Sequence, residues 1–255
     1  MTILIREDEA GIATLTLNMP GKLNALSDGM LAAMHDALDT IADEAGTKVV
    51  IIKGAGKAFC AGHDLGEMQT KDPAALKDLF DRCAAVMQRI QSLPQPVIAQ
   101  VHGIATAAGC QLVATCDLAI ASEDCRFGVN GINIGLFCST PMVALTRNIG
   151  RKAAFEMLTT GRFATAAEAA ALGLINKAVP LTDLEAETKV LAQTIASKRT
   201  STIRIGKSAF YAQAEMTTNN AYTFTGDVMV HNMAHPETTE GISAFLEKRP
   251  PNWDH

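Results

Sequence analysis

The sequence predicts an α/β fold with a largely parallel sheet, followed by a helical C-terminal section. Strand and helix patterns alternate through the first half of the 255-residue chain. A wholly apolar, β-branched run at 49–54 is typical of a strand covered on both faces. Strand patterns nearly disappear beyond residue 138, whereas helical patterns continue to residue 247. We therefore expect a core over residues 1–198 and a helical region over residues 199–255.

Several short segments carry strand patterns. Two of them, near the N-terminus, alternate apolar and polar residues as half-buried strands do, with a polar, glycine-containing turn between them. The others are almost continuously apolar, which indicates burial on both faces and favours a parallel arrangement. The predicted strands are residues 2–7, 11–18, 49–54, 96–103 and 117–122.

Helix starts are marked by capping residues. Ser27 is a favoured N-cap, and Leu26 and Leu31 flank it as a hydrophobic staple. Apolar residues at helical spacing predict a second amphipathic helix over 73–93.

Further helix starts are expected in the second half of the chain. Two capping boxes are present, at Thr165–Glu168 and at Thr182–Glu185, and Gly173 is expected to end the helix that the first of them begins. Pro236 is a natural first-turn residue for another helix.

Composition excludes several classes of partner. The net charge of −5 argues against nucleic acid, whose phosphates need an excess of Lys and Arg. No apolar run reaches the ~18 residues of a membrane span, and the acidic N-terminus does not resemble a targeting peptide. The six cysteines include no C-x-x-C pair. We therefore expect a reduced cytoplasmic protein that binds neither nucleic acid nor membrane.

Two segments rich in small residues each follow a predicted strand: KGAGKAFCAGHDL at 53–65 and VHGIATAAGCQLVATCD at 101–117. Neither is a phosphate loop, because Lys57 is followed by Ala58 and no G-x-G-x-x-G opens a helix. Small residues here are consistent with close packing of two helices. They are equally consistent with two backbone N–H groups that converge on one oxygen atom, which is an oxyanion hole.

Several segments, in this order and spacing, resemble the crotonase superfamily of enoyl-CoA hydratases and isomerases along essentially the whole chain. The segments are PGKLNALS (20–27), AFCAGHDL (58–65), VHGIATAAGCQLVATCDLAIAS (101–122), LTTGRFATAAEAAALGLINKAV (158–179) and EGISAFLEKRPPNW (240–253). The resemblance implies a β-β-α spiral core and C-terminal helices that assemble trimers, often paired into hexamers.

The resemblance also implies a substrate and a carbonyl site. An acyl-CoA thioester is expected to place its carbonyl oxygen between the backbone N–H groups of His63 and Ala108. The family more often has glycine at the position of Ala108. Coenzyme A is part of the substrate in this family, and no separate cofactor is implied.

Other residues are expected near the ligand by the same resemblance. Lys248 is also explained as a solvated helix end, Asp64 as a cap or turn residue, and Cys138 either as an activated thiol near a helix N-terminus or as a buried inert one. The implied substrate-binding residues are Lys22, Leu23, Ala25, Ala61, Asp64, Asn133, Cys138, Phe245 and Lys248.

The usual catalytic acids are missing. Hydratases of this family carry two glutamates, and the resemblance aligns these with Gln111 and Gly131. An amide can orient water but cannot accept its proton, and glycine can do neither. His63 is a candidate acid or base because histidine titrates near neutrality; the alternative is a packed histidine. Weak or absent hydration is therefore expected.

Three functions remain open from the sequence. The first is an enoyl-CoA hydratase- or isomerase-like lyase of fatty acid metabolism. The second is decarboxylation of a malonyl-type CoA, which needs no general base; crotonase-type decarboxylases have tyrosine about where Cys138 falls. The third is acyl-CoA binding without catalysis. Enoyl-CoA hydratase domain-containing proteins of the mitochondrial type share GIATAAGCQL and IGLFCSTP, and resemble the chain in lacking both glutamates.

No metal site is predicted. His231 and His235 are four residues apart in a helical pattern, but no third ligand of suitable spacing accompanies them. Phe59, Phe137 and Met142 are candidates for shaping an acyl pocket, with ordinary core packing as the alternative.

Overall fold

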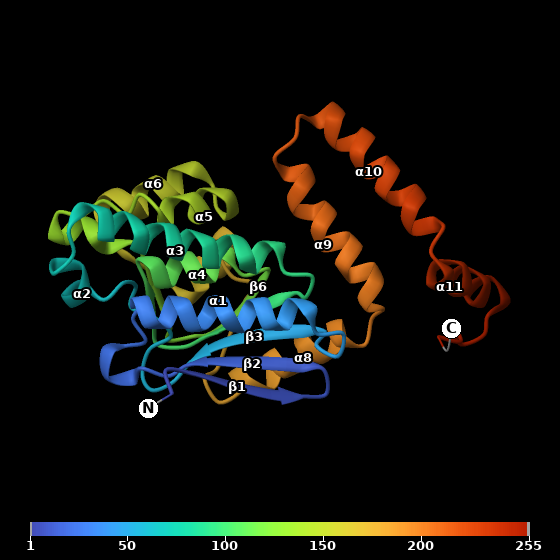
Figure 1. Ribbon diagram of the computed structural model, residues 1–255, viewed down its shortest axis with the longest axis horizontal. Helices are drawn as coiled ribbons and strands as arrows, with labels where there is room; N and C mark the ends of the chain where they lie inside the picture. The colour runs from blue at the N-terminus through green and yellow to red at the C-terminus, as the bar shows by residue number, and fades with distance from the viewer. Residues whose placement is uncertain (1, 254–255) are drawn as a thin grey trace. The chain divides into compact units, whose positions relative to one another are not determined.

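A computed structural model describes residues 2–253, and the chain divides after Ala196 into two compact units (Figure 1). The first unit contains a six-stranded sheet in the order β1-β2-β3-β4-β6-β9. β1 is antiparallel to β2, and every other neighbouring pair is parallel, as predicted for the core. The strands are β1 (Leu4–Glu9), β2 (Ile12–Leu17), β3 (Val49–Gly54), β4 (Val97–Val101), β6 (Leu118–Ser122) and β9 (Lys177–Val179).

Alternating residues of the strands face two apolar layers. Val50 and Ile52 of β3 pack into the main core, whereas Val49 and Ile51 belong to a second cluster on the opposite face. Helices α1 (Asp28–Asp43) and α3 (Pro73–Ser92) cover the main-core face, and α8 (Leu184–Ala196) covers the other (Figure 1). This double cover explains why the central strands are wholly apolar.

The capping predictions are confirmed except for one. The Ser27 hydroxyl accepts from the N–H of Met30 at 3.2 Å, and Thr165 and Glu168 form both hydrogen bonds of a capping box at the start of α7 (Ala166–Leu172). The box predicted at Thr182 is wrong, because the helix begins at Leu184, so Thr182 does not directly precede the first helical residue as an N-cap would.

A second, three-stranded sheet in the order β5-β7-β8 lies in the same unit. Its strands, β5 (Ile104–Thr106), β7 (Arg126–Gly128) and β8 (Phe163–Thr165), have three residues each, as does β9. The sequence analysis missed all of these strands, because three residues are too few to show an alternating pattern. β5 leads directly into α4 (Ala108–Thr115), which places the TAAG segment where a strand gives way to a helix.

The remaining elements of this unit are short. The 3₁₀ helix η1 (Pro20–Lys22) and α2 (Leu65–Gln69) flank the first small-residue segment, and η2 (Asn130–Ile134) follows β7. Helices α5 (Pro141–Asn148) and α6 (Arg151–Thr160) come next. All six cysteines are buried, and none of them forms a disulfide within residues 2–253.

The second unit consists of three helices, α9 (Thr200–Ala214), α10 (Thr218–Met233) and α11 (Pro236–Glu247). Pro236 occupies the first turn of α11, as predicted, and His235 caps that helix. Within residues 2–253, no helix is both long enough and apolar enough to cross a membrane.

Candidate active site

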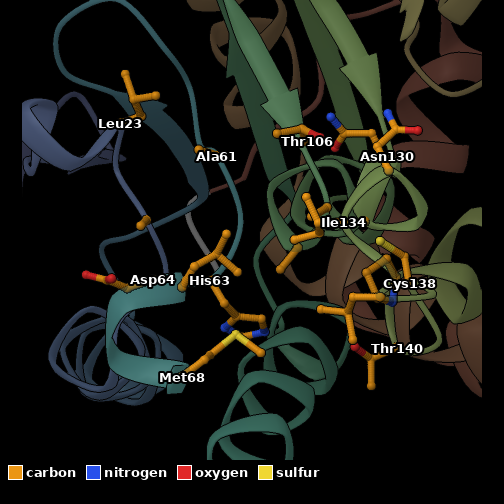
Figure 2. Close-up of a pocket in the computed structure, with 18 of the residues that line it drawn as sticks. Leu23, Ala61, His63, Asp64, Met68, Thr106, Asn130, Ile134, Cys138 and Thr140 are labelled. Atoms are coloured by element: carbon orange, nitrogen blue, oxygen red, sulfur yellow. Dashed lines mark hydrogen bonds between the residues drawn. The ribbon is translucent and has the colours of Figure 1, made fainter. Parts of the chain in front are cut away.

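One cavity of about 780 Å³ gathers most of the residues that the sequence singled out. Its lining comes from two sides (Figure 2). We call residues 61–68 together with 107–108 the donor wall, and residues 130–141 the thiol wall. Of the predicted residues, the cavity is lined by Lys22, Leu23, Ala25, Ala61, His63, Asp64, Ala108, Gly131, Asn133 and Cys138.

Main-chain pairing joins the two small-residue segments of the donor wall. The N–H of Cys60 donates to Ile104 O at 3.1 Å, and the N–H of Thr106 donates to Cys60 O at 3.0 Å. Gly62 lies so close to the helix start that a Cβ there would be 3.2 Å from the nitrogen of Ala108. The backbone at His63, the next residue, is thereby held beside the first turn of α4.

The backbone strain of this wall falls on Ala107. Ala107 precedes α4 with φ 49° and ψ −120°, a conformation that costs a non-glycine residue of order 1–3 kcal/mol. Ala108 is the first helical residue and has no positive φ. Alanine at position 108 therefore presents its N–H without backbone strain of its own.

Two N–H groups of the donor wall have no acceptor. Among residues 2–253, neither the N–H of His63 nor that of Ala108 donates to a protein atom. The first N–H groups of a helix have no intrahelical partner, and they carry the positive end of the helix dipole. The donor wall therefore carries two N–H donors, at His63 and Ala108, that no atom of the described residues uses.

The imidazole of His63 is fixed in one tautomer. Nδ1 lies 3.1 Å from Leu26 O; a carbonyl oxygen can only accept, so Nδ1 carries the proton. Nε2 therefore presents a lone pair, is buried, and has no partner within residues 2–253. The ring packs edge-on against Phe80, with 5.5 Å between centroids. Burial lowers the pKa of His63, so the ring is neutral at pH 7.

Asp64 is occupied by structural contacts. Its carboxylate caps α2 by accepting from the N–H groups of Gly66 at 3.0 Å and Glu67 at 3.3 Å. It also accepts from Lys22 Nζ at 2.5 Å, and this hydrogen bond is the main cause that lowers the pKa of Asp64. Asp64 thus stays ionised and paired at the edge of the cavity.

The thiol wall presents side chains instead. The Thr106 hydroxyl donates to Asn130 Oδ1 at 2.5 Å, which leaves the amide Nδ2 of Asn130 as a donor. Asn133 Nδ2 donates to Gly161 O at 3.3 Å. Figure 2 shows Asn130 and Cys138 across an open space from Ala61 and His63.

Gly131 has no room for a side chain. A Cβ at this position would lie 2.3 Å from Leu136 O and 2.9 Å from Cys138 Sγ. Such distances require the backbone at Leu136 to move. The absence of a carboxylate at position 131 is therefore built into the local structure.

Gln111 departs from the expected arrangement. It is buried within α4, one turn after Ala108, and does not line the cavity. Its Oε1 is buried without a partner among residues 2–253. The carboxamide therefore lies in the protein interior near the donor wall, and its predicted role toward water stays a prediction.

The remaining candidates fall elsewhere. Phe59 is fully buried in the core and Phe137 lines the cavity, whereas Met142 does not line it. Phe245 and Lys248 belong to the second unit, and their predicted contact with coenzyme A stays a prediction. His231 lies in α10 and His235 caps α11; within residues 2–253 no three His, Cys, Asp or Glu side chains are grouped as metal ligands.

Several lining residues were missed as site residues. Met68 and Phe80 are apolar helix residues that a sequence cannot distinguish from core positions. Thr106 and Ala107 precede Ala108 directly in the quoted TAAG segment, and this position beside the predicted donor is the signal that could have identified them. The other missed lining residues are Gly21, Leu65, Gly66, Ile134, Leu136, Thr140 and Pro141.

Known proteins resemble the chain over nearly its full length. The model of the enoyl-CoA hydratase/isomerase family matches residues 7–255. The human enoyl-CoA hydratase domain-containing protein 3, mitochondrial by its name, is 46% identical over 248 residues, which cover 96% of this chain and 81% of that protein.

Solved structures agree with this match. The crystal structure of an enoyl-CoA hydratase from Mycobacterium smegmatis has a TM-score of 0.98 at 52% identity and covers 100% of both chains. The human domain-containing protein 3 has a TM-score of 0.96 at 43% identity, covering 99% of this chain and 100% of that one. The predicted crotonase-type α/β fold with C-terminal helices is confirmed.

Proposed function

We propose a function from the premise that this chain belongs to the enoyl-CoA hydratase/isomerase family, whose members act on acyl-CoA thioesters. In the proposed complex, the thioester carbonyl oxygen accepts hydrogen bonds from the backbone N–H groups of His63 and Ala108. The observation that carries the proposal is the pair of unpartnered donors on one wall of the cavity.

These donors stabilise the charge that develops on the carbonyl oxygen. When an electron pair is left at the carbon beside a thioester, the carbonyl becomes an enolate and its oxygen becomes negative. A preorganised N–H donor at such an oxygen is worth about 3 kcal/mol. The pair therefore supports enolate chemistry whatever group supplies the electron pair.

Proton transfer is the weak part of a hydratase reaction here. Asp64 is the carboxylate that lines the cavity, and it is held by Lys22 and by the α2 cap. Gln111 and Gly131, at the positions that resemble the family's glutamates, cannot accept a proton. We therefore propose weak or absent hydration.

Decarboxylation is a second candidate that one observation favours. Breaking the bond between the α-carbon and a carboxylate leaves its electrons on the thioester as an enolate and releases CO₂, so no free base is needed. The carboxylate of Asp64 is already paired with Lys22, and this step does not need it as a base. The amide Nδ2 of Asn130 is a donor that a substrate carboxylate would accept from. Acyl-CoA binding without catalysis is the third outcome of the same test.

One set of assays separates these functions. Wild type is compared with Gln111→Glu for hydration of crotonyl-CoA and for CO₂ release from methylmalonyl-CoA, with Gln88→Glu on the exposed side of α3 as the charge-matched control. Butyryl-CoA is used to measure the shift in melting temperature. If the wild type does not hydrate crotonyl-CoA and Gln111→Glu does, the result supports the proposal that the catalytic acid is missing. Fast hydration by the wild type would contradict that proposal. If butyryl-CoA does not change the melting temperature, the result contradicts thioester binding.

Self-association through the C-terminal helices is part of the proposal. Exposed apolar side chains on α9 and α10, among them Phe210, Tyr222 and Met229, support it. Light scattering is expected to give the mass of a trimer or hexamer, and a monomer would contradict it. Cytoplasmic location stays a prediction.

A further inference from the structure

The side chains of Thr106 and Asn130 meet where two parallel strands end. Thr106 is the last residue of β5, and its register partner Gly128 is the last residue of β7. Just beyond this pair, the N–H of Ala107 donates to Gly128 O at 2.9 Å. The Thr106 hydroxyl donates to Asn130 Oδ1 at 2.5 Å (Figure 2). Together these two hydrogen bonds tie the start of the thiol wall to the residues that lead into Ala108.

The hydrogen bond with Thr106 fixes the orientation of the Asn130 amide. A separation of 2.5 Å is typical of an O–H···O bond and is shorter than the ~2.7–3.2 Å of an N–H···O bond. The amide oxygen therefore faces the hydroxyl, and Nδ2 is left free. Asn130 lines the cavity, and its Nδ2 donates to no acceptor within residues 2–253. The cavity thus has a third donor, which belongs to a side chain.

The charges around the cavity favour an anionic acceptor for this third donor. Asp64 is the one acidic side chain among the described residues that line the cavity, and Lys22 pairs with it at 2.5 Å. No unpaired carboxylate of these residues would therefore repel a negatively charged ligand. Hydrogen bonds to an ionised oxygen are about twice as strong as those to a neutral one. A carboxylate is thus the substituent that gains most from the Asn130 amide.

We propose that Asn130, held by Thr106, selects acyl-CoA thioesters that carry a carboxylate on the α-carbon. Thr106 is the positioning residue of this pair, because it orients the amide that contacts the ligand. The inference rests on the proposed function, since the donor wall must hold the thioester carbonyl. Thr106 stands two residues before the donor at Ala108, so the amide lies closer to that carbonyl than to the end of a long acyl chain. The selection applies whether or not the carboxylate is afterwards released as CO₂.

Two thioesters that differ in one group test this selection. Methylmalonyl-CoA and isobutyryl-CoA have the same branched acyl skeleton, with a carboxylate in the first where the second has a methyl group. Wild type is expected to bind methylmalonyl-CoA about 10-fold more tightly or better in isothermal titration calorimetry. Chromatography checks that the thioester is intact after the titration. If it is consumed, its KM is compared with the inhibition constant of isobutyryl-CoA.

Variants at the two positions assign the preference to the pair. Thr106→Val keeps a branched side chain but removes the hydroxyl, so it is expected to lose most of the preference while binding isobutyryl-CoA as wild type does. Thr106→Ser is expected to keep the preference. Asn130→Asp places a like charge beside the carboxylate and is expected to reverse the preference.

Two exposed positions outside the cavity supply the controls, and both variants are expected to keep the preference. Thr146→Val removes a hydroxyl from α5, and Gln88→Glu adds a negative charge on α3.

The outcomes separate this inference from the proposed function. A wild type that binds both thioesters with equal affinity would overturn the inference alone, and a wild type that binds neither would overturn both. A preference that persists in Thr106→Val and Asn130→Asp would also overturn the inference. Loss of the preference in Thr106→Ser or in either control would contradict the positioning role of the hydroxyl. Binding of isobutyryl-CoA by Thr106→Val shows that the cavity has kept its fold.

Discussion

Among the described residues, the donors that the donor wall leaves unpartnered at His63 and Ala108 are peptide N–H groups, whereas the polar groups of Asn130 and Cys138 on the thiol wall belong to side chains. The N–H groups of His63 and Ala108 are positioned by main-chain pairing at Cys60 and Thr106. Asn130 and Cys138 are instead positioned by a hydroxyl and by the contact with Gly131. The hydrogen bonds that the donor wall can offer therefore depend on backbone geometry, whereas those of the thiol wall depend on which residues are present.

Removing one donor is the strongest test of this contrast. Ala108 is at the first position of α4, where proline is tolerated and removes the N–H. We expect Ala108→Pro, made in an Ala107→Gly background, to lower kcat/KM about 100-fold or more for whichever thioester reaction is detected. If no turnover is found, the butyryl-CoA melting shift is measured instead.

The Ala107→Gly single variant is the control for that experiment. Glycine relieves the restriction that proline places on the preceding residue. Equal activity of the double and single variants would show that the Ala108 N–H does not hold the substrate oxygen.

Crowding the donor wall is expected to cost stability. A Cβ at Gly109 would lie 2.1 Å from Cys60 O, so Gly109→Ala must displace the paired main chain. We expect the free energy of unfolding to fall by about 1–3 kcal/mol in urea titration. Gly150→Ala, where nothing lies within 4 Å of the added Cβ, is the matched control. If Gly109→Ala is as stable as that control, the main chain at Cys60 can move aside at little cost in free energy, which would contradict the prediction.

The one titrating ring of the donor wall predicts a pH dependence. Burial lowers the folded-state pKa of His63 below the ordinary value of about 6.5. Between these two values the unfolded chain binds a proton that the folded chain does not. The free energy of unfolding is therefore expected to fall as pH drops below about 6.5, down to the folded-state pKa.

His63→Gln is expected to flatten that part of the pH profile, measured by urea titration at a series of pH values. An unchanged slope in the variant would assign the effect to other groups.

Relieving the strain at Ala107 has the smallest expected effect. Ala107→Gly removes a Cβ from a residue with positive φ but adds freedom to the unfolded chain. We expect a net gain of about 1 kcal/mol or less in the free energy of unfolding. A loss measured by thermal or urea denaturation would show that the alanine methyl group packs more favourably than its conformation costs.

The sequence was most informative where the signal is local. The apolar run at 49–54, the Ser27 cap and the Thr165 box each depend on neighbours in the chain, and the structure confirms them. Strand β9 was missed because its three residues are too few to show a strand pattern. The box at Thr182 was wrong because the helix begins one residue later than the pattern indicates, at Leu184.

The candidate site divides in the same way. The TAAG and AGHD segments predicted the donor wall because the chemistry lies in consecutive peptide groups. Met68 and Phe80 could not be assigned to the cavity, since apolar residues on a helix look alike whether they face a core or a ligand. The clash that excludes a side chain at Gly131 depends on Leu136 folding back on it.

The use of peptide groups at positions 63 and 108 has a consequence for inheritance. Every amino acid except proline supplies the same N–H, so the donor at position 63 does not depend on the imidazole, and the donor at position 108 depends only on a side chain small enough for the buried site of Ala108. A lineage can thus lose one set of acids and bases and acquire another without passing through a form that no longer holds the thioester.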